Sequence, residues 1–445
     1  MSPILSLMRI RFLCLGMTLG YIFAQVPLWS AENMEQAWEI AIRESRQLQA
    51  NRSTRAAADS GVMAAQSARM PKVVNATAYT VLSERPEYVA HTPGMNLGPI
   101  QVPSMEINVP VLDKDFWVSS TQAILPLYTG GKISSLVEQA EAQSRAAASG
   151  EITSLQNLKM NVAENYLLVL RIQGLVEVLQ DSQKAIAAHE KNVQNMFKAG
   201  LVTKNVLLAA QVAKADIDQK VLQASNHLQV AEAAYNRFLW RPLTAAVELE
   251  LMPIPPLSGE LENLTDLAMT HRAELNILAA ESQAIWSKSK EYRSERLPNI
   301  AALGGYTYVQ NESLNNEDYW SASVAMIWTP IDGGVSRSKQ RAAEHQATAL
   351  NKIHDDTRSM IELEVRKNWL EEQESRERVE VTKKAIERSE ENLRVVNHQF
   401  QVGLVTHTEV LDAVALYTQA RTNYCNAAYD AILATYRLRR ATGML

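Results

Sequence analysis

Residues that are apolar or small recur at alternating spacings of three and four along two long stretches of the chain, 131–200 and 334–403. In the second stretch they are Val379, Thr382, Ile386, Ser389, Leu393, Val396 and Phe400, and in the first Val176, Leu179, Ile186, Val193 and Phe197. This is the heptad spacing of a coiled coil, and the helix that returns after each stretch is the natural partner. Each stretch advances 69 residues without proline, and a continuous helix of that length would span about 100 Å. We therefore expect two long antiparallel helical hairpins.

Both expected hairpins turn at the same four residues, Gly-Leu-Val-Thr, at positions 200–203 and 403–406. A glycine suits the left-handed position that ends a helix. In the second tip, Thr406 and Glu409 have the spacing of a capping box, in which each side chain bonds the backbone amide of the other. Val206 stands at the corresponding place in the first tip. We expect only the second tip to carry the complete cap.

The repeated tip belongs to a duplication that runs through the chain. A shift of 203 residues superimposes Gly130-Gly131 on Gly333-Gly334, and further upstream a shift of 227 superimposes Pro71 on Pro298. A repeat of this size indicates two copies of one structural unit. We expect the first unit at 32–240 and the second at 260–445, joined by a proline-rich linker at 241–259.

Each unit begins with a helix, over 32–70 and 260–298, and continues with two stretches of strand-like composition. These stretches are 73–82 and 116–127 in the first unit, and 300–309 and 319–329 in the second. The first two strands are separated by Ser83–Asp115, which holds five prolines and shows no periodicity. This segment is expected to be a long loop.

The last of these strands has an apolar face with a tryptophan at each end. Eight residues separate Trp320 from Trp328, roughly 26 Å of strand, which is close to the apolar band between the aromatic girdles of an outer-membrane barrel. Trp117 stands at the place of Trp320 in the first unit. A two-sided strand in a soluble sandwich is the alternative to this membrane-interface girdle.

The first residues indicate export. Arg9 and Arg11 precede an apolar run from Phe12 to Ala24, which predicts a signal peptide over 1–24, with residue 31 as the later alternative for cleavage. No later stretch has the apolar length of a transmembrane helix, so strands must make any membrane crossing. Four strands cannot close a useful barrel, and several chains must contribute to one.

Taken in order, these features resemble the TolC family of outer membrane efflux proteins. The most specific are Phe400 to Asp412 with its counterpart Phe197 to Leu208, the Gly-Gly turns, and the terminal stretch from Tyr436 to Gly443. The resemblance implies a mostly α fold with a small β portion. It further implies a homotrimer in the outer membrane of a Gram-negative bacterium, with an α-barrel of helical hairpins in the periplasm and a twelve-stranded transmembrane β-barrel in outer membrane lipid. A periplasmic adaptor and an inner-membrane pump are the implied partners, in drug efflux or in type I secretion.

This family implies two sets of site residues beyond the girdle. The adaptor is expected to dock on the tips, at Gly200, Leu201, Thr203, Gly403, Leu404 and Thr406. Glu409 and Asp412 are three residues apart and share one face of the returning helix, so three copies would form two rings of carboxylates at a periplasmic pore constriction. For Glu409 the capping box is an equally good explanation.

Composition argues against other classes of function. The net charge is −5 and the pI about 6.0, with no basic block, so no nucleic-acid partner is expected. The eight histidines are scattered, and Gly131-Lys132 lacks the rest of a phosphate loop. We expect no enzyme activity, no cofactor and no metal. A periplasmic adaptor and a secreted coiled-coil structural protein remain as alternatives, and the transported substrate is not indicated.

Overall fold

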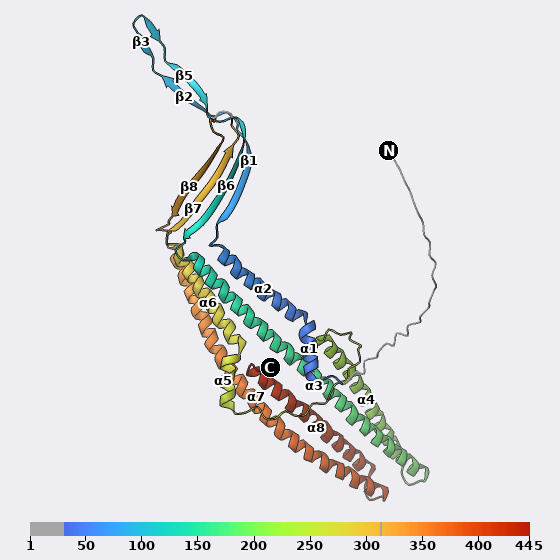
Figure 1. Ribbon diagram of the computed structural model, residues 1–445. Helices are drawn as coiled ribbons and strands as arrows, with labels where there is room; N and C mark the ends of the chain where they lie inside the picture. Colours follow the sequence, from blue (N-terminus) through green and yellow to red (C-terminus); the bar gives the residue numbers. More distant parts are fainter. Residues whose placement is uncertain (1–30, 312–313) are drawn as a thin grey trace, which may run out of the picture.

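The computed structural model describes residues 31–311 and 314–445. It is a long molecule with a sheet at one end and helices along the rest (Figure 1). The helices are α1 (Met34–Glu44), α2 (Arg46–Ser67), α3 (Lys132–Lys198), α4 (Lys204–Phe238), α5 (Leu261–His271), α6 (Ala273–Ser294), α7 (Val335–Gln401) and α8 (His407–Ala441). The strands are β1 (Lys72–Val81), β2 (Glu87–Thr92), β3 (Met95–Leu97), β4 (Ile100–Val102), β5 (Met105–Pro110), β6 (Asp115–Tyr128), β7 (Asn299–Val309) and β8 (Asp318–Ile327). The expected signal peptide, 1–24, lies outside the described residues.

The two halves of the chain contain corresponding elements. α3 and α7 each have 67 residues, and α4 and α8 each have 35. Each long helix packs against the shorter helix that follows it, as the heptad spacing predicts. In α7 the seam residues from Val379 to Phe400 are buried or half-buried, and Phe197 of α3 is the exception because 38% of it is exposed.

The helices expected over 32–70 and 260–298 are each two helices, which corrects the sequence prediction. Ser45 lies between α1 and α2 with an extended backbone (φ −63°, ψ 111°), and its Oγ accepts a hydrogen bond from Leu48 N at 3.2 Å. This is the conformation and the bond of a helix N-cap, so the serine ends one helix and starts the next. Arg272 takes the corresponding place between α5 and α6.

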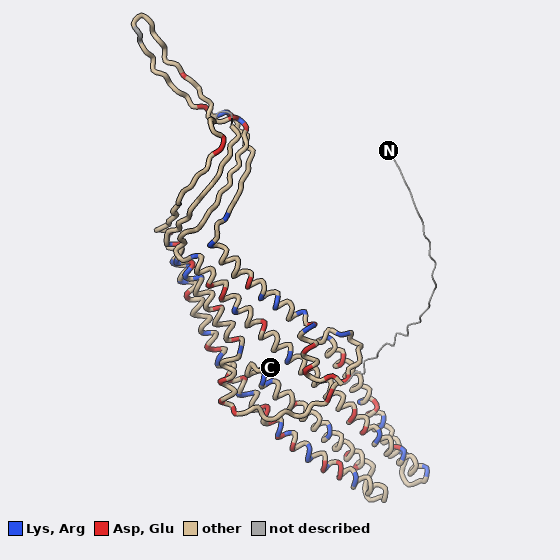
Figure 2. Tube along the Cα trace, viewed as in Figure 1, with Lys and Arg blue, Asp and Glu red and all other residues tan. Residues whose placement is uncertain are grey.

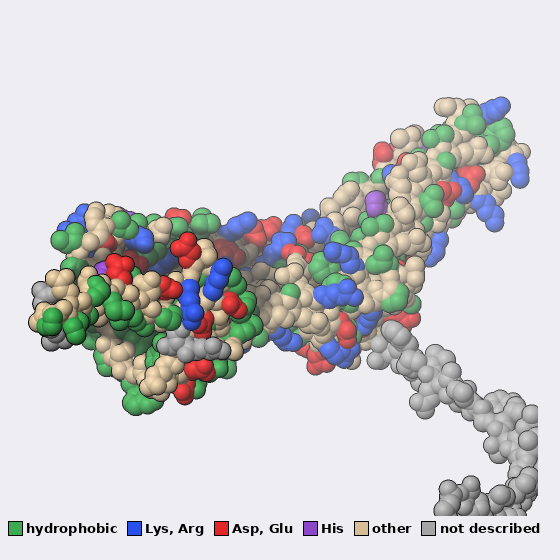
Figure 3. All heavy atoms as spheres, turned by 90° about the horizontal axis from the view of Figure 1, so that it is seen from above, with side chains coloured by type: hydrophobic (Ala, Val, Ile, Leu, Met, Phe, Trp, Pro, Cys, Tyr) green, Lys and Arg blue, Asp and Glu red, His purple; other side chains and the backbone are tan. Residues whose placement is uncertain are grey.

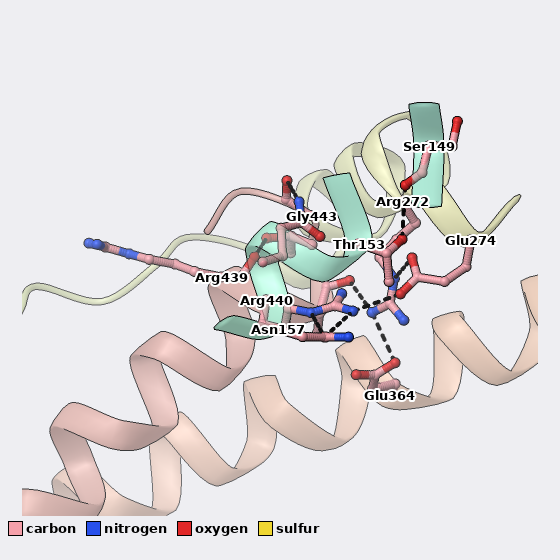
Figure 4. A network of polar contacts seen from close by, with 12 residues as sticks. Ser149, Thr153, Asn157, Arg272, Glu274, Glu364, Arg439, Arg440 and Gly443 are labelled. Atoms are coloured by element: carbon pink, nitrogen blue, oxygen red, sulfur yellow. Dashed lines mark hydrogen bonds and ion pairs between the residues drawn. The ribbon is translucent and has the colours of Figure 1, made fainter. Parts of the chain in front are cut away.

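A polar network fixes the break at Arg272 (Figure 4). The Arg272 guanidinium donates to the Ala441 carbonyl oxygen and pairs with Glu274 and Glu364. Arg440, in the last turn of α8, donates to Glu274 at 2.7 Å and to Asn157 of α3. The network therefore joins four helices of the body at the point where the chain ends.

The segment between the halves packs on the helical body. Tyr166 of α3 and Tyr235 of α4 are fully buried in the largest apolar cluster. The Tyr166 hydroxyl lies 2.8 Å from the Glu32 carbonyl oxygen and 2.7 Å from that of Glu250. Glu372 of α7, also fully buried, accepts bonds from the Ser258 and Thr435 hydroxyls. The middle and the end of the connecting segment are thus tied to long helices.

The four-stranded sheet has the antiparallel order β1-β6-β7-β8, so β1 and β8 are its two edges. Charged residues in these strands are confined to the ends, at Lys72, Asp115 and Asp318, and the strands between are free of charge (Figure 2). Charged side chains of both signs instead cover much of the helical body (Figure 3).

The segment expected to be a long loop is a β-ribbon, which corrects the prediction for Ser83–Asp115. β2 pairs with β5 and β3 with β4, and together they form an arm that projects beyond the sheet (Figure 1). The difference between the two sequence shifts, 24 residues, equals the length of the stretch from Glu87 to Pro110. The prolines lie at the ends and breaks of these short strands, where no ladder hydrogen bond is lost. The arm is therefore the insertion that distinguishes the first half from the second.

Candidate functional site

The two tips have the same backbone geometry. Gly200 and Gly403 both have φ of +77°, the left-handed conformation that a glycine adopts without strain. In the second tip, the amide of Leu404 donates to the Gln399 carbonyl oxygen at 2.9 Å, and the amide of Leu201 donates to Met196 in the same way. These bonds close each long helix.

The caps that start the returning helices differ as the sequence predicts. Thr406 Oγ1 accepts from the amide of Glu409 at 3.4 Å, and the Glu409 carboxylate accepts from the amide of Thr406 at 3.1 Å. Thr203 makes no side-chain cap bond, and Val206 has no side-chain acceptor for the reciprocal bond from the Thr203 amide.

The surface of the tips is partly apolar. Leu201 is 71% exposed and Leu404 is 74% exposed. The side chain of a leucine makes no hydrogen bond in a turn, so turn formation does not explain either side chain. The tip residues proposed for docking therefore lie at the free ends of both hairpins, where a partner can reach them.

Behind the leucines, both hairpin ends share one apolar cluster, which we call the tip cluster. It joins α3, α4, α7 and α8 and consists of Val193, Met196, Val202, Val206, Leu207, Ala210, Val396, Phe400, Val405 and Val410. The two tips are thus packed against each other within one chain.

Next to the tip cluster, two histidines meet across the hairpins. His189 Nε2 of α3 lies 2.7 Å from His407 Nδ1 of α8, and the two rings are within 11° of parallel. Phe400 lies 4.9 Å from the His189 ring. Both histidines are buried, and His407 Nε2 has no hydrogen-bond partner.

Further from the tip, polar bonds continue along the contact between α3 and α8. Arg421 donates to Asp181 at 2.7 Å, the hydroxyls of Ser182 and Thr418 are bonded to each other, and Arg171 pairs with Asp430. The hydrogen bond from Arg421 lowers the pKa of Asp181. A series of polar contacts therefore connects the first hairpin to the second from the body to the tip.

Glu409 and Asp412 both lie exposed in the first two turns of α8. Glu409 is occupied by the capping box, whereas Asp412 takes no part in the cap. Their role at a pore constriction stays a proposal.

At the opposite end of the molecule, aromatic side chains gather on one face of the sheet near the arm. Trp117, Tyr306 and Trp320 share this face in the strand register, and Tyr79 packs on Trp117 with ring centroids 5.0 Å apart. Trp328 lies at the other end of β8, where its Nε1 donates to the Arg296 carbonyl oxygen. All three tryptophans proposed for the girdle are exposed.

The same face of the first half carries polar residues that bond to one another. Asn75 Nδ2 donates to Thr121 Oγ1 at 2.8 Å, and the hydroxyls of Thr77 and Ser119 are 3.1 Å apart. Side chains that bond each other in this way need no water. This pairing explains how polar residues fit on a face whose ends are aromatic.

Comparison with known proteins shows which family has this architecture. The family model described as outer membrane efflux protein matches residues 38–239 and 264–444. The chain belongs to the outer membrane efflux protein family. It is 23% identical over 424 residues to the outer membrane protein TolC of Vibrio cholerae, covering 93% of this chain and 91% of that protein. It is 21% identical over 343 residues to the alkaline protease secretion protein AprF of Pseudomonas aeruginosa, covering 75% and 71%. The outer membrane protein VceC of Vibrio cholerae has the same fold, with a TM-score of 0.77 at 15% identity over 92% of this chain and 96% of that one.

As a member of the outer membrane efflux protein family, the chain is an outer membrane protein with a mostly helical fold, as predicted. None of the helices in its described part is long and apolar enough to cross a bilayer. Among residues 31–311 and 314–445, no group of three or more His, Cys, Asp or Glu side chains could hold a metal ion.

Sequence reasoning missed the histidine pair of this family member. His189 and His407 are 218 residues apart, and the duplication does not relate them. The available signal was weak: His189 falls on the apolar face of α3, four residues before the seam residue Val193, and His407 directly follows the capping threonine.

Proposed function

We propose that the protein is the outer membrane exit duct of a tripartite efflux or type I secretion system, and that it works as a homotrimer. The observation that carries the proposal is that one chain joins a four-stranded sheet with two open edges to two helical hairpins. Each hairpin consists of a helix of 67 residues and a helix of 35 residues. Three such sheets joined at β1 and β8 make a closed barrel of twelve strands, which removes every edge. The α-helical hairpins then continue the same wall into the periplasm.

The sheet supports this placement in the membrane. Its strands lack charge except at their ends, its polar side chains bond each other, and aromatic residues lie near both ends. Trp117, Trp320 and Trp328 are proposed as the girdle at the membrane interfaces. The arm would then project on the extracellular side.

The tips supply the sites for the periplasmic partners. We assign adaptor docking to Gly200, Leu201, Thr203, Gly403, Leu404 and Thr406, and the constriction to Asp412 with Glu409. The adaptor in turn would connect the duct to an inner-membrane pump. The earlier alternatives, an adaptor or a secreted structural coiled coil, are set aside because the chain belongs to a family of outer membrane efflux proteins.

Channel recording in planar bilayers tests the duct directly. The purified protein should give unitary conductance steps when it is added to one side of the bilayer. The tips are expected to remain in the solution on that side. Absence of conductance from a folded, membrane-inserted oligomer would contradict the proposal. Crosslinking in cells, followed by identification of the captured inner-membrane pump, would separate drug efflux from protein secretion.

A further inference from the structure

The contact between His189 and His407 is the last polar link between the two hairpins before the tips. Links further from the tips on the contact between α3 and α8 include Arg421 with Asp181, Ser182 with Thr418, and Arg171 with Asp430. Each of the charged links pairs a permanent cation with a carboxylate, and the third joins two hydroxyls. Among the contacts that the described residues make between α3 and α8, the histidine pair alone joins two groups that change charge between pH 5 and 8.

The surroundings of the pair are apolar. Phe400 of the tip cluster packs on the His189 ring, and Val193 and Val410 of the same cluster follow His189 and His407 by one helical turn. The charged or titratable side chains on the corresponding turns of the four helices are half-exposed or exposed: Glu190 and Lys191 of α3, Lys204, Lys214 and Asp218 of α4, Glu391, Arg394 and His398 of α7, and Glu409 and Asp412 of α8. Several are already paired, Lys214 with Asp218, Glu391 with Arg394, and Glu409 with the cap of Thr406.

Protonation is costly at this position. The neutral pair is held by one N–H···N hydrogen bond, in which one ring donates and the other accepts. One added proton can be shared by the two rings, but it places a full positive charge in an apolar cluster. It also lies at the first residue of α8, where the helix dipole disfavours a cation. A second proton removes the acceptor and sets two like charges 2.7 Å apart.

We propose that the His189–His407 contact is an acid-sensitive joint, which holds the second tip against α3 at neutral pH and releases it on acidification, so that the periplasmic entrance opens. This regulation rests on the proposed function as a duct, although the joint itself lies within one chain. His407 is the first residue of α8, so release there frees the end of the hairpin that carries Asp412.

The direction of the pH dependence follows from proton binding. Burial, and next His407, lowers the pKa of His189 from its ordinary value of 6.5 to about 4, and burial lowers the pKa of His407. Separated rings in water bind protons more readily than rings in the contact. The contact is therefore fully stable above pH 6.5 and weakens as the pH falls toward 4. From His189 alone, the release equilibrium shifts by about tenfold between pH 7.5 and pH 5.5.

The test uses variants that keep a hydrogen bond but cannot titrate. The Gln amide group lies near the position of a histidine Nε2, and the Asn amide group near that of Nδ1, so His189→Gln and His407→Asn preserve the contact. His398→Gln, an exposed histidine on α7, is the matched control. In planar bilayers, lowering the periplasmic-side pH from 7.5 to 5.5 should raise the open probability of the unmodified protein and of His398→Gln about tenfold. His189→Gln and His407→Asn should lose most of that rise.

A structural measurement separates the joint from the duct. Spin labels at Lys204→Cys on α4 and Thr408→Cys on α8, in a Cys425→Ser background, report the distance between the hairpins in detergent. This distance should increase at pH 5.5 in the unmodified sequence and stay constant with His189→Gln. Equal pH responses in all variants, in either measurement, would overturn the joint. A change in label distance without any conductance would retain the joint and contradict the duct.

Discussion

At the scale of single residues, the tips combine turn formation with features that the turn does not require. Gly403 and Thr406 are explained by backbone geometry, since one is left-handed and the other caps α8. Leu404 and Asp412 are exposed and have no such explanation. Predictions about docking and conduction are therefore sharpest at Leu201, Leu404 and Asp412.

Replacing both tip leucines should remove docking without destabilising the protein. With Leu201→Ser and Leu404→Ser together, we expect crosslinking to the adaptor to be lost. Each exposed leucine should change the free energy of unfolding by less than about 0.5 kcal/mol. Leu222→Ser, at a leucine that is 72% exposed on α4 and distant from the tip, is the control. Undiminished crosslinking in the double variant would leave the tips with only a structural role.

Asp412→Ala should reduce the preference of the channel for cations. In a trimer it removes a ring of three carboxylates, and we expect the ratio of cation to anion permeability to fall by up to about tenfold. Block by divalent or trivalent cations should weaken with it. Asp216→Ala is a suitable comparison, because Lys220 pairs with Asp216 at 2.7 Å and offsets its charge. Unchanged selectivity and block would place Asp412 on the outer wall.

At the scale of elements, the arm is an addition to a structural unit that occurs without it in the second half of the chain. The second half connects its strands through residues 310–317 alone, while the first half inserts β2 to β5. Hydrogen bonds between Arg85 and Asp113, and between the amide of Val111 and the Pro86 carbonyl oxygen, hold the base of the arm. β2 and β5 pack mainly on each other.

Removing the arm should therefore leave assembly intact. We expect a chain with 87–110 replaced by Gly-Gly to form the same oligomer, with a thermal midpoint within about 1 °C of the unmodified protein, which for a chain of this size corresponds to about 1 kcal/mol. Thermal unfolding followed by circular dichroism, and conductance in bilayers, measure this. A chain that no longer assembles would show that the arm contributes to the contact between subunits.

At the scale of the whole molecule, one chain exposes far more surface than a monomer of its mass should. Its accessible surface is 29335 Å², whereas a compact monomer of 49.6 kDa exposes roughly 17,000 Å². Within residues 31–311 and 314–445, both sheet edges, β1 and β8, also lack a second neighbouring strand. Association with further copies would bury part of this surface and give each edge strand a second neighbour.

The oligomer extracted from the outer membrane should therefore contain three chains. Native mass spectrometry of the detergent complex gives the number directly, and three times the mass of the processed chain is expected. A Gly or Pro substitution in β1 that disrupts its edge should lower the trimer fraction more than the same change in the β2–β5 arm. A stable monomer or dimer would exclude the twelve-stranded barrel.

The sequence by itself determined the local structure of this protein. Heptad spacing, glycine at the tips and the pair Thr406 and Glu409 fixed the long helices and their ends, because these features act through dihedral preferences and bonds within a few residues. The same reasoning failed at Ser45, since a serine can either continue a helix or cap one. It also failed at the arm, because prolines without periodicity indicate a loop, although short paired strands lie between them.

Only the tertiary structure decided which distant residues meet. The contact of His189 with His407 depends on the rotation of α3 and α8 about their axes, and heptad spacing within each hairpin leaves the contact between hairpins unspecified. The bonds between Asn75 and Thr121 depend on strand register, which one-residue shifts would abolish. Rotation and register are set by the packing of all the elements together, so no short stretch of sequence contains them.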